Sequence, residues 1–78
     1  MNEEELILNN LGLAYMVANK YKNKVGYYYE FEDVLQICYE GLVRAAKNYD
    51  DSRGVAFSTY ACNVMQNHIS NVIKHIYR

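Results

Sequence analysis

Several kinds of residue and segment are scarce in this 78-residue sequence, and each absence excludes a class of protein. Its cysteines, Cys38 and Cys62, are too few and too far apart for a disulfide framework, so we interpret them as small hydrophobes on apolar helix positions. No apolar run is long enough to span a membrane, and the acidic start Met1-Asn2-Glu3-Glu4-Glu5 is unlike a secretory leader. These absences predict a reduced, cytoplasmic setting with no membrane partner.

Positive charge is also scarce. The formal net charge is −1, from 8 lysines and arginines against 9 carboxylates. All the carboxylates lie at or before Asp51, and the cations after it are Arg53, Lys74 and Arg78. The sequence therefore lacks the strongly basic patch that binds duplex DNA through charge alone. We predict that the isolated chain binds nucleic acid weakly.

Patterns that carry catalysis or hold metals are missing as well. His68 and His75 are seven residues apart, with Cys62 six residues before the first, which is not a zinc-ligand spacing. The sequence contains no Gly-rich phosphate loop, no paired catalytic carboxylates and no nucleophile with its base. We predict a protein that is not an enzyme and needs no metal or cofactor.

What the sequence does contain is helical periodicity, on a length that predicts one domain with a marginally stabilising core. Three segments favour an all-α, three-helix bundle with helices at about 3–23, 31–48 and 58–77, the first two connected through Gly26 and Tyr27-Tyr28-Tyr29. Gly12, inside the first helix, is expected to permit a close helix contact. The predicted core stripes are Ile7, Leu11, Ala14, Ala18 and Tyr21; Leu35, Cys38, Leu42, Ala45 and Tyr49; and Ala61, Met65, Ile69, Val72 and Ile76.

The third helix follows a turn, Asp50-Asp51-Ser52-Arg53, that ends at Gly54, a residue able to take positive φ without strain. Ser58 or Thr59 is expected to cap the helix. Off its core stripe lie two aromatic residues followed by amides, a hydroxyl and a lysine, namely Phe57, Tyr60, Asn63, Asn67, Ser70, Asn71 and Lys74. This set suits stacked bases of a nucleic-acid strand. The alternative interpretation is a core aromatic pair beside a solvated polar face.

The second helix has a mixed outer face. Acidic residues at its start suit the helix dipole, and apolar residues outside its core stripe suit contact with a helix of another protein. Ordinary scattered surface hydrophobes are the alternative. The residues of this face are Glu32, Asp33, Gln36, Ile37, Tyr39, Glu40 and Val43.

The motif Arg53-Gly54-Val55-Ala56-Phe57-Ser58-Thr59-Tyr60-Ala61 closely resembles the segment of bacterial sigma-70 factors that opens the promoter −10 element. Asn10-Leu11-Gly12-Leu13, Ala18-Asn19-Lys20-Tyr21, and Glu32-Asp33-Val34-Leu35-Gln36 with Gly41-Leu42 resemble earlier segments of that family, in order and at the right separations. The resemblance covers roughly residues 6 to 78. It implies a sigma region 2-like domain that acts in transcription initiation.

For the third helix, the resemblance implies contacts with the non-template strand of promoter DNA. Tyr60 would stack on the flipped adenine of the −10 element, with Phe57 and Thr59 along the same strand path. Asn67 and Ser70 stand where the family reads the upstream base pair. Asn10 and Lys20 match other DNA-contacting positions. Two tryptophans that housekeeping members use as a wedge against the duplex are replaced by Asn63 and Val64, so strong autonomous melting is not expected. Gly12 replaces a frequent basic residue, so one phosphate contact is expected to be lost.

For the second helix, the resemblance implies docking on the coiled-coil clamp helices of the RNA polymerase β′ subunit. Asp33 and Gln36 match the family motif, whereas Ile37 replaces an acid and Tyr39 an asparagine, which indicates a specialised partner surface. The predicted polymerase-binding residues are Glu32, Asp33, Gln36, Ile37, Tyr39 and Val43.

The −35-reading domain of the family, region 4, is missing from the sequence. The chain is then either an excised fragment or a stand-alone co-sigma subunit of the RsoA-like split type, with region 4 on a second sigma-like polypeptide; Met1 and the small size slightly favour a complete polypeptide. A hypothesis of another class is a regulatory interaction module that binds polymerase or a sigma partner without DNA contact. Low positive charge and the absent tryptophans favour it, whereas Phe57, Thr59, Tyr60 and Asn67 disfavour it.

Overall fold

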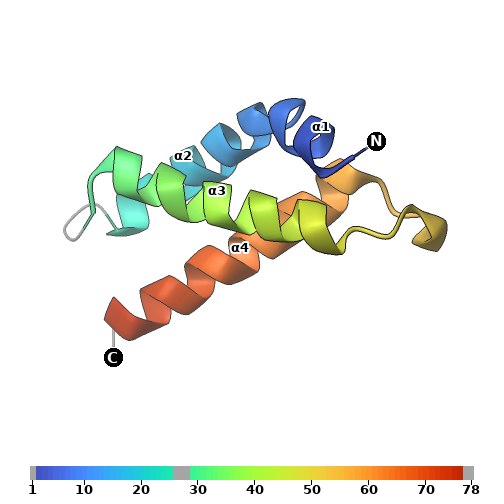
Figure 1. The fold of residues 1–78 in the computed structure, drawn as a ribbon. Helices are drawn as coiled ribbons and strands as arrows, with labels where there is room; N and C mark the ends of the chain where they lie inside the picture. Colours follow the sequence, from blue (N-terminus) through green and yellow to red (C-terminus); the bar gives the residue numbers. More distant parts are fainter. Residues whose placement is uncertain (1, 26–28, 77–78) are drawn as a thin grey trace.

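The computed structural model describes residues 2–25 and 29–76, and these form four α-helices and a short 3-10 helix (Figure 1). The elements are α1 (Glu3–Leu8), α2 (Leu11–Val25), α3 (Phe31–Asn48), η1 (Asp51–Arg53) and α4 (Phe57–Ile76). The all-α prediction is confirmed. Within the described ranges, no helix combines the length and the apolar character that a membrane crossing needs.

The single first helix predicted over residues 3–23 is wrong, because the chain turns at Asn9 and Asn10 and forms α1 and α2 instead. A capping box starts α1, in which the Asn2 side chain accepts a hydrogen bond from the Glu5 N–H at 2.8 Å. At the other end, the Asn10 side-chain amide donates to the Leu6 carbonyl at 2.8 Å. This bond satisfies a carbonyl that continuation of the helix would otherwise have paired.

The other two predicted helices are present. α3 spans the predicted range, and α4 begins at Phe57, one residue earlier than predicted. The Tyr60 N–H donates to the Ala56 carbonyl at 3.1 Å, so Ser58 and Thr59 lie inside the first turn and are not its caps. Gly54 has φ 76°, as the predicted turn requires.

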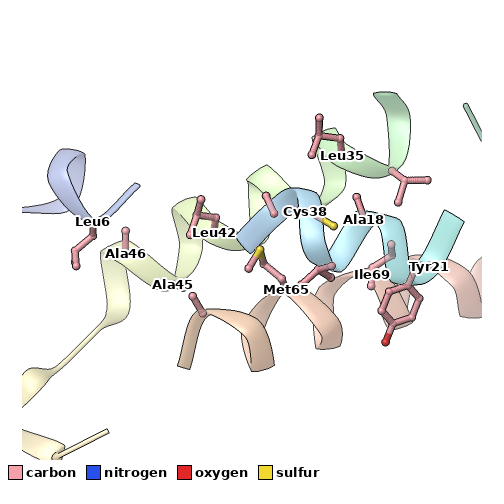
Figure 2. Packing of buried hydrophobic residues seen from close by; sticks show 14 of the residues in the cluster. Leu6, Ala18, Tyr21, Leu35, Cys38, Leu42, Ala45, Ala46, Met65 and Ile69 are labelled. Atoms are coloured by element: carbon pink, nitrogen blue, oxygen red, sulfur yellow. The ribbon is translucent and has the colours of Figure 1, made fainter. Parts of the chain in front are cut away.

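The core lies around α3, which contacts each of the other three helices. Figure 2 shows Cys38 and Leu42 of α3 meeting Met65 and Ile69 of α4, with Ala18 and Tyr21 of α2 beside them. Burial raises the pKa of the Cys38 thiol to about 11, so this thiol stays protonated and behaves as a small hydrophobe at neutral pH. α4 diverges from α3 toward its C-terminal end (Figure 1), and Val72, expected in the core, is only half-buried.

The close helix contact expected at Gly12 occurs at Gly41 instead. A Cβ atom on Gly41 would lie 2.9 Å from the Cα atom of Met65, whereas a Cβ atom on Gly12 would meet nothing within 4 Å. Leu11, expected in the core, is exposed, because α2 starts anew at this residue and its apolar face is set independently of α1. Gly26, Tyr27 and Tyr28 lie outside the described residues, and Tyr29 packs partly buried against the core.

Candidate nucleic-acid interface and docking face

The segment between α3 and α4 projects beyond the helix ends at one side of the molecule (Figure 1). The Asp50 carboxylate accepts hydrogen bonds from the Ser52 hydroxyl at 2.6 Å and from the Ser52 N–H at 3.0 Å. These two bonds hold the pKa of Asp50 below its usual value. The Arg53 guanidinium lies 3.8 Å from the same carboxylate, in an exposed pair. The segment therefore presents two carboxylates, Asp50 and Asp51, and one cation, Arg53, on a tightly turned backbone.

Three aromatic rings gather where this segment joins the helices. The Tyr49 ring meets Phe57 edge-on, with ring centres 5.2 Å apart, and Tyr60 at a tilt, with centres 5.8 Å apart. The Tyr49 hydroxyl donates a hydrogen bond to the Val55 carbonyl at 2.7 Å. Tyr60 remains half-buried, so part of its ring is open to a ligand.

A groove of about 470 Å³ opens beside these rings. It combines two aromatic walls with an amide, a carboxylate and a guanidinium, which suits a flat heterocycle whose edge forms hydrogen bonds. Its lining residues are Asn48, Tyr49, Asp50, Arg53, Val55 and Tyr60. Of these, the sequence reasoning selected only Tyr60 as a site residue. The overlooked residue was Tyr49. Its apolar spacing led to its placement in the predicted core, although its position directly before the turn could have indicated a site residue.

A larger hollow of about 690 Å³ lies on the other side of Tyr49, between α1 and the end of α3. Three carboxylates, from Glu3, Asp50 and Asp51, line it together with one cation, Lys47. Its net negative charge would repel a phosphate backbone. We therefore assign the candidate base site to the smaller groove, beside Tyr60.

Phe57 lacks the exposed surface that a strand contact requires. Only 8% of the residue is exposed, and it packs in the core against Tyr49. The alternative interpretation, a core aromatic, therefore describes Phe57 but not Tyr60. The two differ because Phe57 lies on the same side of α4 as Ala61 and Met65, whereas Tyr60 lies toward the outer side.

The other predicted residues of α4 share its outer face, at steps of three and four. The face is uncharged apart from Lys74 and carries no carboxylate. Asn63, Asn67 and Asn71, spaced one turn apart, are all exposed. In the described part of the chain, the side chains of this face that follow Tyr60 along α4 have no hydrogen-bond partner, and neither does the Tyr60 hydroxyl. The face comprises Thr59, Asn63, Asn67, Asn71 and Lys74, which are exposed, and Ser70, which is half-buried.

The two DNA-binding residues predicted from the first segment lie apart from the groove lining. Lys20 is exposed on α2. Asn10 is half-buried, and its side-chain amide nitrogen is occupied by the Leu6 carbonyl. Asn10 therefore has a structural role at the α1–α2 turn, and its side-chain oxygen and second amide N–H are left for another partner.

The outer face of α3 exposes Glu32, Asp33, Gln36 and Val43, whereas Ile37 and Tyr39 are half-buried and pack against the core. The Asp33 carboxylate also accepts a hydrogen bond from the Glu30 N–H at 3.1 Å, so it caps the helix.

The outer face of α3 continues onto α2 through Tyr15, a residue that the sequence reasoning did not select. The Tyr15 ring meets Tyr39 edge-on, with centres 6.4 Å apart, and lies 6.3 Å from the Phe31 ring. Tyr15 itself is 48% exposed.

The outer faces of α3 and α4 lie on different helices, and at their border a residue of α4, His68, contacts a residue of α3, Glu40. The His68 Nε2 atom lies 3.1 Å from the Glu40 Oε1 atom. No group of histidine, cysteine or acidic side chains that could hold a metal ion occurs in the part of the chain that the structure describes.

A family model described as "Sigma-70 region 2" matches residues 6–76. The "RNA polymerase sigma factor SigA" of Microcystis aeruginosa is 39% identical over 59 residues, which are 76% of this chain and 14% of that protein. The "RNA polymerase sigma-C factor" of a Nostoc species is 40% identical over 60 residues, 77% of this chain and 14% of that protein. The chain thus spans a small part of these relatives. No solved structure is significantly similar to it.

Proposed function

This chain belongs to the sigma-70 region 2 family, and from that premise we propose that it is a transcription initiation domain that binds core RNA polymerase and the −10 element of promoters. The family is not enzymatic. The observation that carries the proposal is the groove between Tyr49 and Tyr60, because it offers stacking surface and hydrogen-bonding groups at the end of an amide-rich helix face that carries no carboxylate. Its place of action would be the cytoplasm.

In this proposal, one base of the non-template strand leaves the stack and enters the groove. Unstacking a base costs a few kcal/mol, and stacking on an aromatic side chain returns roughly 1–3 kcal/mol. Tyr60 supplies the stacking surface, while Arg53 and Asp50 lie where they can bond the edge of the base. The family resemblance identifies this base as the flipped adenine of the −10 element. Thr59, Asn63, Asn67, Ser70 and Asn71 would follow the neighbouring nucleotides along α4.

The domain is proposed to capture a strand that is already open. Asn63 and Val64 provide no aromatic wedge, and Lys74 is the single cation on the outer face of α4. Few phosphates would be neutralised, so affinity should depend weakly on salt. Unwinding would then depend on the assembled polymerase.

We expect Lys74→Gln to make the salt dependence of strand binding shallower. Loss of one phosphate contact should reduce the slope of log affinity against log salt by about 0.7 for single-stranded DNA. Fluorescence titration of a −10 oligonucleotide against the polymerase complex at several salt concentrations measures this slope. Lys22→Gln, on α2, is the matched control and should leave the slope unchanged. Equal slopes for the Lys74 variant and the wild type would remove Lys74 from the strand path.

Core polymerase is proposed to dock on the outer face of α3 through the clamp helices of its β′ subunit. The Gln36 side chain is exposed and has no hydrogen-bond or ion-pair partner among the described residues. The Val43 side chain is apolar and also exposed, so both side chains are available to a partner helix. Glu32, Asp33, Ile37 and Tyr39 complete the face, with Tyr15 beside it.

A charge placed at Val43, the C-terminal member of this face, should weaken docking. We expect Val43→Glu to lower capture of a β′ clamp-helix fragment at least tenfold and Gln36→Ala to lower it less, because a buried, unpaired carboxylate in an interface costs several kcal/mol. Pull-down with the tagged chain measures capture. Asp33→Ala is a poor probe, since it also removes a helix cap. Asn71→Ala, on α4, is the control. Normal capture by Val43→Glu would move the docking surface elsewhere.

A second candidate function is a regulatory module that binds polymerase or a sigma partner without touching DNA. The scarcity of cations and the larger, acidic hollow favour it. Adding the chain to core polymerase with a labelled single-stranded −10 oligonucleotide separates the two. Our proposal requires retention of the oligonucleotide only when the chain is present. Polymerase binding without such retention would support the regulatory module.

The −35 contacts of the family are proposed to come from outside the described helices. They would lie either on another part of a longer protein or on a second sigma-like polypeptide, as in a co-sigma pair. Purification of the tagged protein from its own cell separates these alternatives. A second sigma-like polypeptide in equal amount would support the co-sigma arrangement, and a single longer chain would support the fragment.

A further inference from the structure

We propose that the Tyr49 hydroxyl is a positioning group that holds the base groove in its binding shape, an inference that rests on the proposed function. The hydroxyl donates to the Val55 carbonyl at 2.7 Å and thereby joins the two ends of the segment 49–55. Four of the residues that line the groove belong to this segment, namely Tyr49, Asp50, Arg53 and Val55. One hydrogen bond therefore sets the distance between opposite parts of the groove wall.

The other described interactions of the segment are local. Backbone hydrogen bonds join Arg53 to Asp50 and Gly54 to Asp51, and the Asp50 side chain bonds Ser52. The ion pair between Arg53 and Asp50 is long and exposed, so it contributes little. Val55 is 44% exposed and is not fixed by burial. Among the described side chains, the Tyr49 hydroxyl is thus the group that bonds the far end of the segment, next to Ala56, whose carbonyl accepts from the Tyr60 N–H.

The position of the hydroxyl is itself well determined. The Tyr49 ring packs edge-on against Phe57, which is buried, and this contact fixes the position of the hydroxyl oxygen. The same ring lies against Tyr60, the proposed stacking surface. Loss of the hydroxyl would release Val55 while both ring contacts remain. The segment would then have to be ordered when the base binds, and that entropy would be subtracted from the affinity.

The test is Tyr49→Phe in the full chain bound to core polymerase, with two single-stranded −10 oligonucleotides as probes. One probe is intact, and the other has an abasic site in place of the flipped adenine. We expect the variant to bind the intact probe roughly twofold to tenfold more weakly than the wild type. Both proteins should bind the abasic probe equally, because no base then occupies the groove.

Two results would overturn the inference: equal affinity of variant and wild type for the intact probe, or an equal loss on both probes, which indicates general destabilisation. Tyr21→Phe, which removes a hydroxyl from a buried tyrosine outside the groove, should bind both probes like the wild type. Tyr60→Ala separates this inference from the proposed function. If Tyr60→Ala binds the intact probe normally, the DNA role itself fails. If Tyr60→Ala weakens binding and Tyr49→Phe does not, only the positioning role fails.

Discussion

Replacing Tyr60 with alanine is expected to weaken binding of the single-stranded −10 element to the polymerase complex by roughly 5-fold to 150-fold, because one base loses its aromatic stacking surface. The Tyr60 ring is half-buried against Tyr49, so part of it remains free to stack. The loss should appear mainly as faster dissociation of the oligonucleotide. Fluorescence titration and stopped-flow dissociation with a labelled non-template strand measure both quantities.

Tyr60→Phe is the matched control, because it keeps the ring and removes only the hydroxyl, for which the structure describes no hydrogen bond. It should retain most of the affinity. Capture of the β′ clamp helices by Tyr60→Ala should remain normal, since the proposed docking surface is on α3. Unchanged strand binding by Tyr60→Ala would exclude a DNA role for the groove. A simultaneous loss of polymerase capture would instead indicate a folding defect.

The second large effect is expected at Gly41, a residue of α3 that faces α4. Among the described glycines, it is the one at which an added Cβ atom would meet a neighbouring helix. A methyl group there would meet the Met65 Cα atom at 2.9 Å, and a backbone atom cannot move aside as a flexible side chain can. Overpacking of this kind costs about 1–3 kcal/mol. We therefore expect Gly41→Ala to lower the free energy of unfolding by that amount relative to a glycine-to-alanine change in open space.

Gly12 provides that reference, because it is helical and a methyl group there meets nothing within 4 Å. Gly12→Ala should stabilise the chain by about 0.5–1 kcal/mol through helix propensity. Urea unfolding followed by circular dichroism compares the two variants. If Gly41→Ala proves as stable as Gly12→Ala, the two helices can separate at low cost, and the described packing of α3 on α4 is incorrect.

Local sequence signals placed several elements correctly. The apolar steps and acidic start of α3 predicted its range, and Gly54 marked a turn that requires positive φ. The same periodicity failed at Asn9 and Asn10. It counts apolar residues and ignores side-chain amides that bond the backbone, such as that of Asn10 on the Leu6 carbonyl. Local bonding of this kind ended α1. The apolar residues of α2 then face the core in a register that does not continue that of α1.

What the sequence by itself determined about this protein was its helical class, its family, and the amide-rich outer face of α4, because these depend on spacing along one chain. Only the tertiary structure decided that Phe57 is core while Tyr60 borders a groove, that Gly41 and not Gly12 lies at a close contact, and that Tyr49 holds Val55. Periodicity indicates which side of a helix is apolar. It does not say which neighbour approaches that side, or how closely, since contacts between residues distant in sequence depend on how all the helices pack together.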